Sequence, residues 1–69
     1  MQVTAELTGN LWKVVVQEGQ QVQADETLMI LESMKMEIPV TAPKAGRVSR
    51  ILVKEGQPVQ EGQPLAEID

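Results

Sequence analysis

The segment from Glu32 to Glu37 places a lysine, Lys35, between two methionines near the middle of a 69-residue chain. A lysine carries a primary amine on a long, flexible stem, and that amine can capture an activated acyl group as a stable amide. The amide is then a tether, which holds the acyl group at high effective concentration near separate partner sites. The flanking Met34 and Met36 have flexible, apolar side chains that adapt to a partner's surface. The chemistry offered by this segment is therefore acylation of Lys35.

The composition argues against most other chemistry. The chain has no cysteine and no histidine, so it has neither a disulfide framework nor a usual zinc or iron site. Its only serines are Ser33 and Ser49, and the sequence offers no histidine or similar general base to activate either of them as a nucleophile. We therefore expect no catalytic residues and no metal, and a module on which enzymes act rather than an enzyme.

Charge and hydropathy suggest a small soluble domain. The net charge is -4, with acidic and basic residues mixed along the chain, which argues against a nucleic-acid partner. There is no basic-plus-apolar leader and no apolar run long enough to span a bilayer, so we expect no membrane partner and a cytoplasmic location. Hydrophobic residues make up 42% of the chain and only Trp12 is aromatic, so the core must be aliphatic.

The chain contains an internal repeat. Residues 3–32 can be laid on residues 40–69 at a constant offset of 37 without gaps, and 11 of the 30 pairs are identical. Chance would give about two identities at typical residue frequencies. Two copies predict one closed domain of quasi-two-fold symmetry, because an open solenoid needs three or more repeats. We expect this domain to cover residues 1–69, with residues 33–39 as a hairpin that joins the copies.

Each copy has the pattern of short β-strands. Residues 11–16 and 48–53 are rich in branched aliphatic side chains, but their apolar positions are spaced by three and then by two. A regular strand has a period of two, so we predict a bend or bulge within each segment. No segment keeps a helical period over three turns. The pattern predicts an all-β fold of about eight short strands in two four-stranded sheets, with glycine turns between them.

Residues 29–40 predict the central hairpin, with Met34 and Lys35 at its turn. Asn-Gly or Asp-Gly would be the usual pair at such a turn, so the local preference is overridden, which points to function. Taken singly, most exposed lysines are only solvated and most methionines fill a core. The position of Lys35 at the junction of the two copies is what distinguishes it.

Three other residues stand out beside the hairpin or within the first copy. Glu32 and Glu37 bracket the turn and are candidates for recognition by a partner, although a solvated carboxylate is the commoner role. Trp12 aligns with Ser49, so the repeat does not require its size. We expect Trp12 to pack half-buried, where it covers the bend after Leu11 or forms part of a docking surface.

The residues from Glu32 to Met36 resemble the biotin attachment motif of biotin carboxyl carrier domains, commonly Glu-Ala-Met-Lys-Met. The repeat resembles the whole biotinyl/lipoyl domain family over essentially the full chain, and small stand-alone biotin/lipoyl attachment proteins above all. This resemblance implies a flattened barrel-sandwich of two four-stranded antiparallel sheets. It also implies that the target lysine lies on a protruding hairpin, at the end opposite the two termini.

The resemblance also implies a function for the motif residues. Lys35 would take biotin from biotinyl-adenylate through a biotin protein ligase, with Met34 and Met36 helping the ligase to choose this lysine. Glu32, Ser33 and Glu37 are further candidates for recognition. The attached biotin would be carboxylated at a biotin carboxylase site and would deliver the carboxylate at a carboxyltransferase site.

Two departures from the family pattern bear on this interpretation. Ser33 stands where the biotin motif usually has alanine, and Glu-Ser before the target is similar to lipoyl domains, so lipoylation of Lys35 by a lipoate ligase stays open. The gapless repeat leaves no room for the protruding loop of some carboxyl carrier domains. A third hypothesis is an unmodified interaction module, in which the repeat is only a scaffold.

Overall fold

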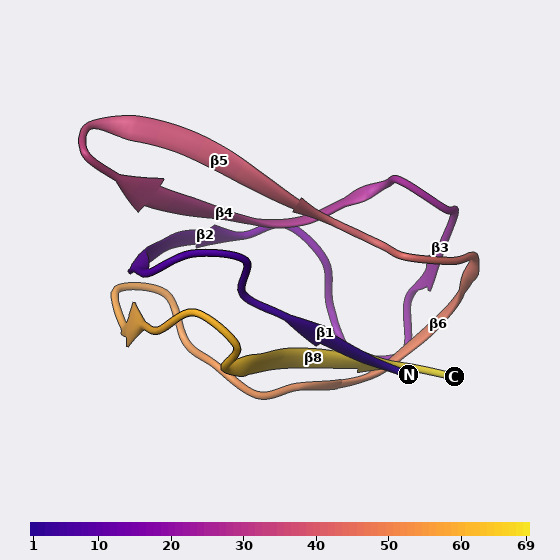
Figure 1. The fold of residues 1–69 in the computed structure, drawn as a ribbon. Helices are drawn as coiled ribbons and strands as arrows, with labels where there is room; N and C mark the ends of the chain where they lie inside the picture. The colour runs from indigo at the N-terminus through magenta and orange to yellow at the C-terminus, as the bar shows by residue number, and fades with distance from the viewer.

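The computed structural model describes residues 1–69 as eight short β-strands and no helix, which confirms the all-β prediction. No helix is present that is long and apolar enough to cross a membrane. The strands are β1 (Gln2–Thr4), β2 (Gly9–Val14), β3 (Gln21–Val22), β4 (Thr27–Ser33), β5 (Met36–Thr41), β6 (Gly46–Ile51), β7 (Pro58–Val59) and β8 (Pro64–Ile68) (Figure 1).

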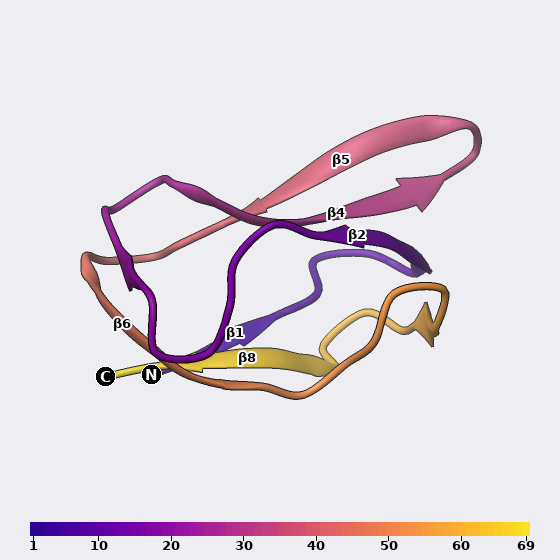
Figure 2. The ribbon, with the colours of Figure 1, turned by 180° about the vertical axis from the view of Figure 1, so that it is seen from behind.

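The strands form two four-stranded antiparallel sheets. Their orders are β1-β8-β6-β3, which we call sheet 1, and β5-β4-β2-β7, which we call sheet 2. The offset of 37 residues carries β1 to β4 onto β5 to β8, so each sheet takes two strands from each copy of the repeat. The sheets face each other as a flattened barrel-sandwich that is not closed into a barrel (Figures 1 and 2). Neither copy can complete a sheet without the other.

The core between the sheets is entirely apolar. It contains 15 buried residues, none of them polar, and all are Val, Leu, Ile, Ala or Met, as the composition predicted. Fourteen of the 15 form seven pairs related by the offset of 37, such as Leu11 with Val48 and Leu28 with Leu65. The remaining one is Val3, whose equivalent, Val40, is partly buried and packs against the same core. The repeat is thus a repeat of core positions.

Both bulges predicted from the spacing are present. The pairing register shifts between Leu11 and Lys13 in β2, and at the equivalent place in β6. A carboxylate from the opposite copy satisfies the backbone next to each bulge. The Val14 N–H donates to Glu55 Oε2 at 2.8 Å, and the Ile51 N–H donates to Glu18 Oε2 at 2.9 Å.

The turns that carry these glutamates dock on the other copy. Gly19 and Gly56 have φ of 90° and 87°, the left-handed region that glycine adopts without strain. Their N–H groups donate to the carbonyls of Val48 and Leu11, at 2.7 and 2.6 Å. The repeated Glu-Gly-Gln turn therefore joins the two copies at two equivalent corners.

We predict that Glu18→Ala and Glu55→Ala lower the free energy of unfolding by similar amounts, about 1 kcal/mol each, because each removes one charge-assisted hydrogen bond to a bulge. Urea denaturation of each variant measures this change. Glu61→Ala is the matched control, since this exposed carboxylate accepts no hydrogen bond from the chain. Equal stability of all three variants would show that the two bonds contribute nothing.

Candidate functional site

The hairpin of β4 and β5 ends in a two-residue turn made of Met34 and Lys35. Ser33 pairs with Met36 across the last step of the ladder, and pairing continues down to Thr27 and Thr41 at the other end. Met34 and Lys35 have φ of 52° and 65°. Positive φ at both central residues is the signature of a type I′ turn, which normally uses asparagine or glycine. The prediction that local turn preference is overridden here is confirmed.

The left-handed turn is strained. Each residue other than glycine costs roughly 1–2 kcal/mol in this conformation, because its Cβ approaches the following carbonyl oxygen. The pairing and packing of β4 and β5 must therefore stabilise the hairpin by more than this conformational cost. The inner face of the hairpin provides this stabilisation by burying Met29 and Leu31 in the core.

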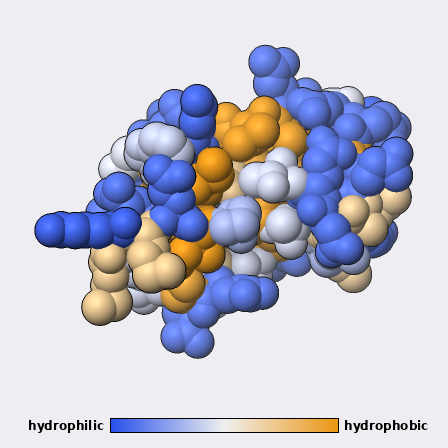
Figure 3. Space-filling model, turned by 90° about the horizontal axis from the view of Figure 1, so that it is seen from above, coloured by the Kyte–Doolittle hydropathy of each residue, from blue (hydrophilic) through white to orange (hydrophobic).

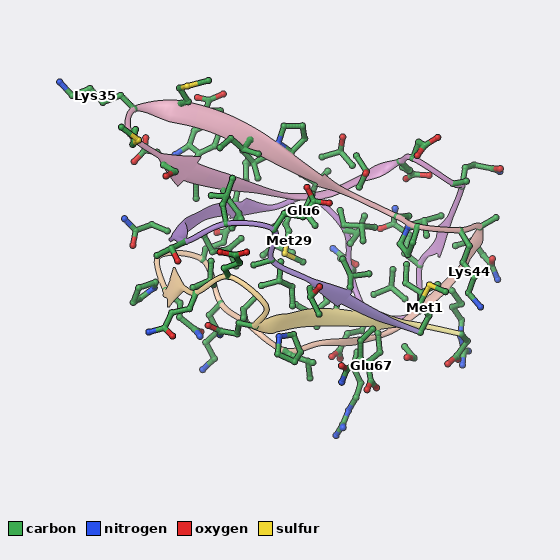
Figure 4. All side chains as sticks on the ribbon, in the orientation of Figure 1. Met1, Glu6, Met29, Lys35, Lys44 and Glu67 are labelled. Carbon is green, nitrogen blue, oxygen red and sulfur yellow. The ribbon has the colours of Figure 1, made fainter.

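Lys35 projects into solvent from the far end of the hairpin, away from both termini (Figures 1 and 4). The chain has one ion pair, between Arg47 and Asp69, so the Lys35 amine has no ionic partner. It also takes part in none of the side-chain hydrogen bonds. An exposed amine free of partners on a short turn is open to an acyl donor bound in another protein's active site.

The methionines on either side of Lys35 are also exposed. Met34 has 91% of its surface exposed and Met36 has 63%, whereas Met29, farther down β4, is fully buried. Exposed apolar side chains at a hairpin tip do not stabilise the core. Their placement leaves them available for contact with a partner.

Glu32 and Glu37 face each other directly across β4 and β5, and both are exposed. Like charges at directly opposite positions destabilise a sheet, and neither carboxylate has a cation within ion-pair distance. The pair places two negative charges on the outer face of the hairpin, one step below the turn.

Ser33 fixes the hairpin to the body of the domain. Its Oγ donates to the carbonyl of Thr8 at 3.2 Å. Beside it, a Cβ on Gly9 would lie 2.7 Å from the carbonyl oxygen of Glu32, so only glycine permits this approach. Sequence reasoning placed Ser33 at the site but missed Thr8, because nothing local marks a contact between residues 25 positions apart.

Trp12 occupies the bulge of β2 and has 48% of its surface exposed, close to the expected half-buried packing. The Nζ of the neighbouring Lys13 lies 6.0 Å from the centre of the Trp12 ring, at the outer limit of a cation–π contact.

Comparison with known proteins is consistent with this geometry. The family model described as "Biotin-requiring enzyme" matches residues 1–68, which include both copies and the hairpin. The chain belongs to this biotin/lipoyl family.

Individual relatives support the assignment. A biotin/lipoyl attachment protein of Bacillus subtilis is 47% identical over 68 residues, which are 99% of this chain and 93% of that protein. The alpha3 subunit of a biotin-dependent acyl-coenzyme A carboxylase of Mycobacterium leprae is 46% identical over 66 residues, which are 96% of this chain and 11% of that subunit. The crystal structure of Kluyveromyces lactis urea carboxylase superimposes with a TM-score of 0.95 at 39% identity, over 100% of this chain and 6% of the carboxylase. The family thus includes proteins of this size and segments of much larger carboxylases.

We predict that Met34→Asn raises the free energy of unfolding by about 1 kcal/mol, because asparagine tolerates positive φ better than methionine does. Met36→Asn is the control, since Met36 lies in a strand and has no positive φ. Urea denaturation of the two variants compares them. If both shift stability equally, the turn is not strained at Met34.

Proposed function

We propose that this protein is a non-catalytic carrier that holds biotin as an amide on Lys35. The observation that carries this proposal is the solvent-exposed lysine between Met34 and Met36 on a strained hairpin turn, in a chain of the biotin/lipoyl family. An amide acceptor requires only a reachable amine, and the Lys35 side chain meets that requirement. The proposed location is the cytoplasm.

Attachment of biotin is a substitution at an acyl carbon. The Lys35 amine attacks the carbonyl of biotinyl-adenylate held by a biotin protein ligase, a C–N bond forms, and the bond from that carbon to the phosphate oxygen breaks. AMP leaves and the amine loses a proton. Met34 and Met36 provide apolar contacts that position the turn, while Ser33 holds the hairpin against Thr8. Glu32 and Glu37 present charge to a cationic rim on the ligase.

After attachment, the ureido ring of biotin accepts carboxylate at a biotin carboxylase site and releases it at a carboxyltransferase site. The role of this chain is to move that ring between the two sites on a long, flexible lysine arm. Relatives named as acyl-coenzyme A and urea carboxylases support partners of this kind, since they contain a homologous segment within a longer chain.

A second candidate is lipoate on the same lysine. Ser33 before Met34 departs from the biotin motif toward that of lipoyl domains, and the Bacillus subtilis relative is named as a biotin/lipoyl attachment protein. The same exposed amine would serve a lipoate ligase, so one site accommodates both modifications.

We predict a single biotinyl increment in the intact mass of the protein after incubation with a biotin protein ligase, biotin and ATP. Lys35→Arg should abolish it, because the guanidinium does not replace the amine as acceptor. Lys44→Arg is the matched control and should keep the increment. Incubation with a lipoate ligase tests the second candidate in the same way.

The outcomes separate the three hypotheses. An increment lost only in Lys35→Arg supports the carrier, and the ligase that produces it identifies the cofactor. If the wild-type protein gains no mass with either active ligase, the carrier proposal fails and an unmodified interaction module remains.

A further inference from the structure

The two sheets provide an internal comparison, because the offset of 37 relates most positions on the outer face of one sheet to a position on the other. Sheet 2 carries the lysine hairpin and sheet 1 does not. Positions that the fold itself requires should be similar on both outer faces. Where the two side chains of an equivalent pair differ, the fold does not determine their identity, and the residue on sheet 2 can have a function that is specific to the side with the lysine hairpin.

The outer faces differ along one row of three strands. On sheet 2 this row holds three apolar side chains together with Lys13, and on sheet 1 the equivalent positions, with Arg50 in place of Lys13, are all polar. The three equivalent pairs are Trp12 and Ser49, Ile30 and Glu67, and Pro39 and Gln2. Figure 4 shows Glu67 on the outer side of β8, away from the buried Met29.

The three apolar residues of sheet 2 are neighbours. Ile30 of β4 pairs with Pro39 of β5 on one side and with Lys13 of β2 on the other, and the bulge places Trp12 beside Lys13. Ile30 points outward, because Met29 and Leu31 on either side of it point into the core, and Pro39 pairs with Ile30 and shares its face. Trp12 is about half exposed at the bulge. Trp12 and Pro39 are exposed and Ile30 is partly buried between them. We call this set the Trp12–Ile30–Pro39 row.

The fold does not require apolar residues in this row. Sheet 1 has the same strands, register and bulge, with Ser49 and Glu67 in place of Trp12 and Ile30. Ser49 there donates its hydroxyl to the backbone carbonyl of Glu67. Neighbouring exposed apolar side chains that the packing does not require are a feature of interaction surfaces. Figure 3, seen from the side of sheet 2, shows strongly hydrophobic surface in the middle of the molecule with paler, near-neutral residues among it.

We propose that the Trp12–Ile30–Pro39 row is a docking surface for the biotin protein ligase. This inference rests on the carrier function proposed above. Pro39 lies four residues from Lys35 along β5, or about 13 Å at 3.3 Å per residue. The ligase must bring the amine of Lys35 itself into its active site, without the added length of biotin, so the surface around that site comes close to this row.

Charge and area favour the ligase over two other occupants. Glu32 and Glu37 lie between the row and the turn without an ionic partner, and Lys13 lies beside the row. We therefore expect the ligase to present cations near the turn and apolar side chains against the row. The carboxylase sites reach the biotin ring through the longer biotinyl-lysine arm and need no contact with the row. A stable pair of copies would bury about 800 Å² on each partner, far more than three side chains provide, whereas a transient encounter between an enzyme and its substrate protein buries less.

The test is the steady-state rate of biotinylation at varied concentrations of the carrier, with the ligase, biotin and ATP held constant. We expect the double variant Trp12→Ser with Ile30→Thr to raise KM for the carrier about tenfold with kcat unchanged, because tryptophan is enriched among interface hot spots and about 1.4 kcal/mol corresponds to a factor of ten. Leu52→Thr is the control, since Leu52 is an exposed apolar residue outside the row and should leave KM unchanged.

A second measurement separates docking from chemistry. Lys35→Arg cannot be acylated but keeps the row, so it should inhibit biotinylation of the wild-type carrier competitively. Adding the two row substitutions to Lys35→Arg should weaken that inhibition about tenfold. Circular dichroism of each variant verifies the fold, and Ser49 shows that serine is tolerated at an equivalent bulge.

Two results would overturn the inference. One is a KM for the row variant within twofold of the wild-type and Leu52→Thr values. The other is a fall in kcat at unchanged KM, which would mean that the row affects the chemical step rather than binding. Failure of the wild-type protein to accept biotin would instead refute the carrier function itself.

Discussion

The fold depends on burying an all-aliphatic core that neither half of the chain can bury alone. A domain of this size encloses little apolar surface, and this one has no disulfide to support it. The strands of the two copies are therefore interleaved, so that each sheet contains both copies and the core consists of equivalent pairs such as Leu11 with Val48. Glu18 and Glu55 add a further link between the copies, because each accepts a hydrogen bond from a backbone N–H beside the bulge of the opposite copy.

The two-sheet core is stable enough to tolerate unfavourable local conformations and charge contacts at the end of the hairpin. Met34 and Lys35 adopt left-handed backbone conformations, and Glu32 faces Glu37 across the strands. Each arrangement opposes folding locally. They persist because the same two strands bury Met29 and Leu31 farther down, where the stabilisation is much larger. Unfavourable local structure concentrated at one exposed turn is what a site selected for its reactivity with partners would show.

The quasi-symmetry separates residues that build the fold from residues that serve the hairpin side. Where the copies agree, as at Gly19 and Gly56, the residue has the same structural contact twice. Where they disagree on the outer faces, as at Trp12 and Ser49, the scaffold accepts either side chain. In a two-fold repeat, each residue can therefore be compared with its equivalent in the other copy, which separates structural requirements from functional ones.

The sequence by itself determined the number of strands, the two-fold repeat, both bulges and the place of Lys35 on the turn, because each is a local or periodic pattern. It also indicated, through the absence of Asn-Gly, that local turn preference is overridden at Met34 and Lys35, and the structure showed the positive φ values that result. Only the tertiary structure decided that Glu55 bonds Val14 and that Ser33 bonds Thr8. Those partners lie 41 and 25 residues apart, and no local pattern specifies which distant groups meet once two sheets pack together.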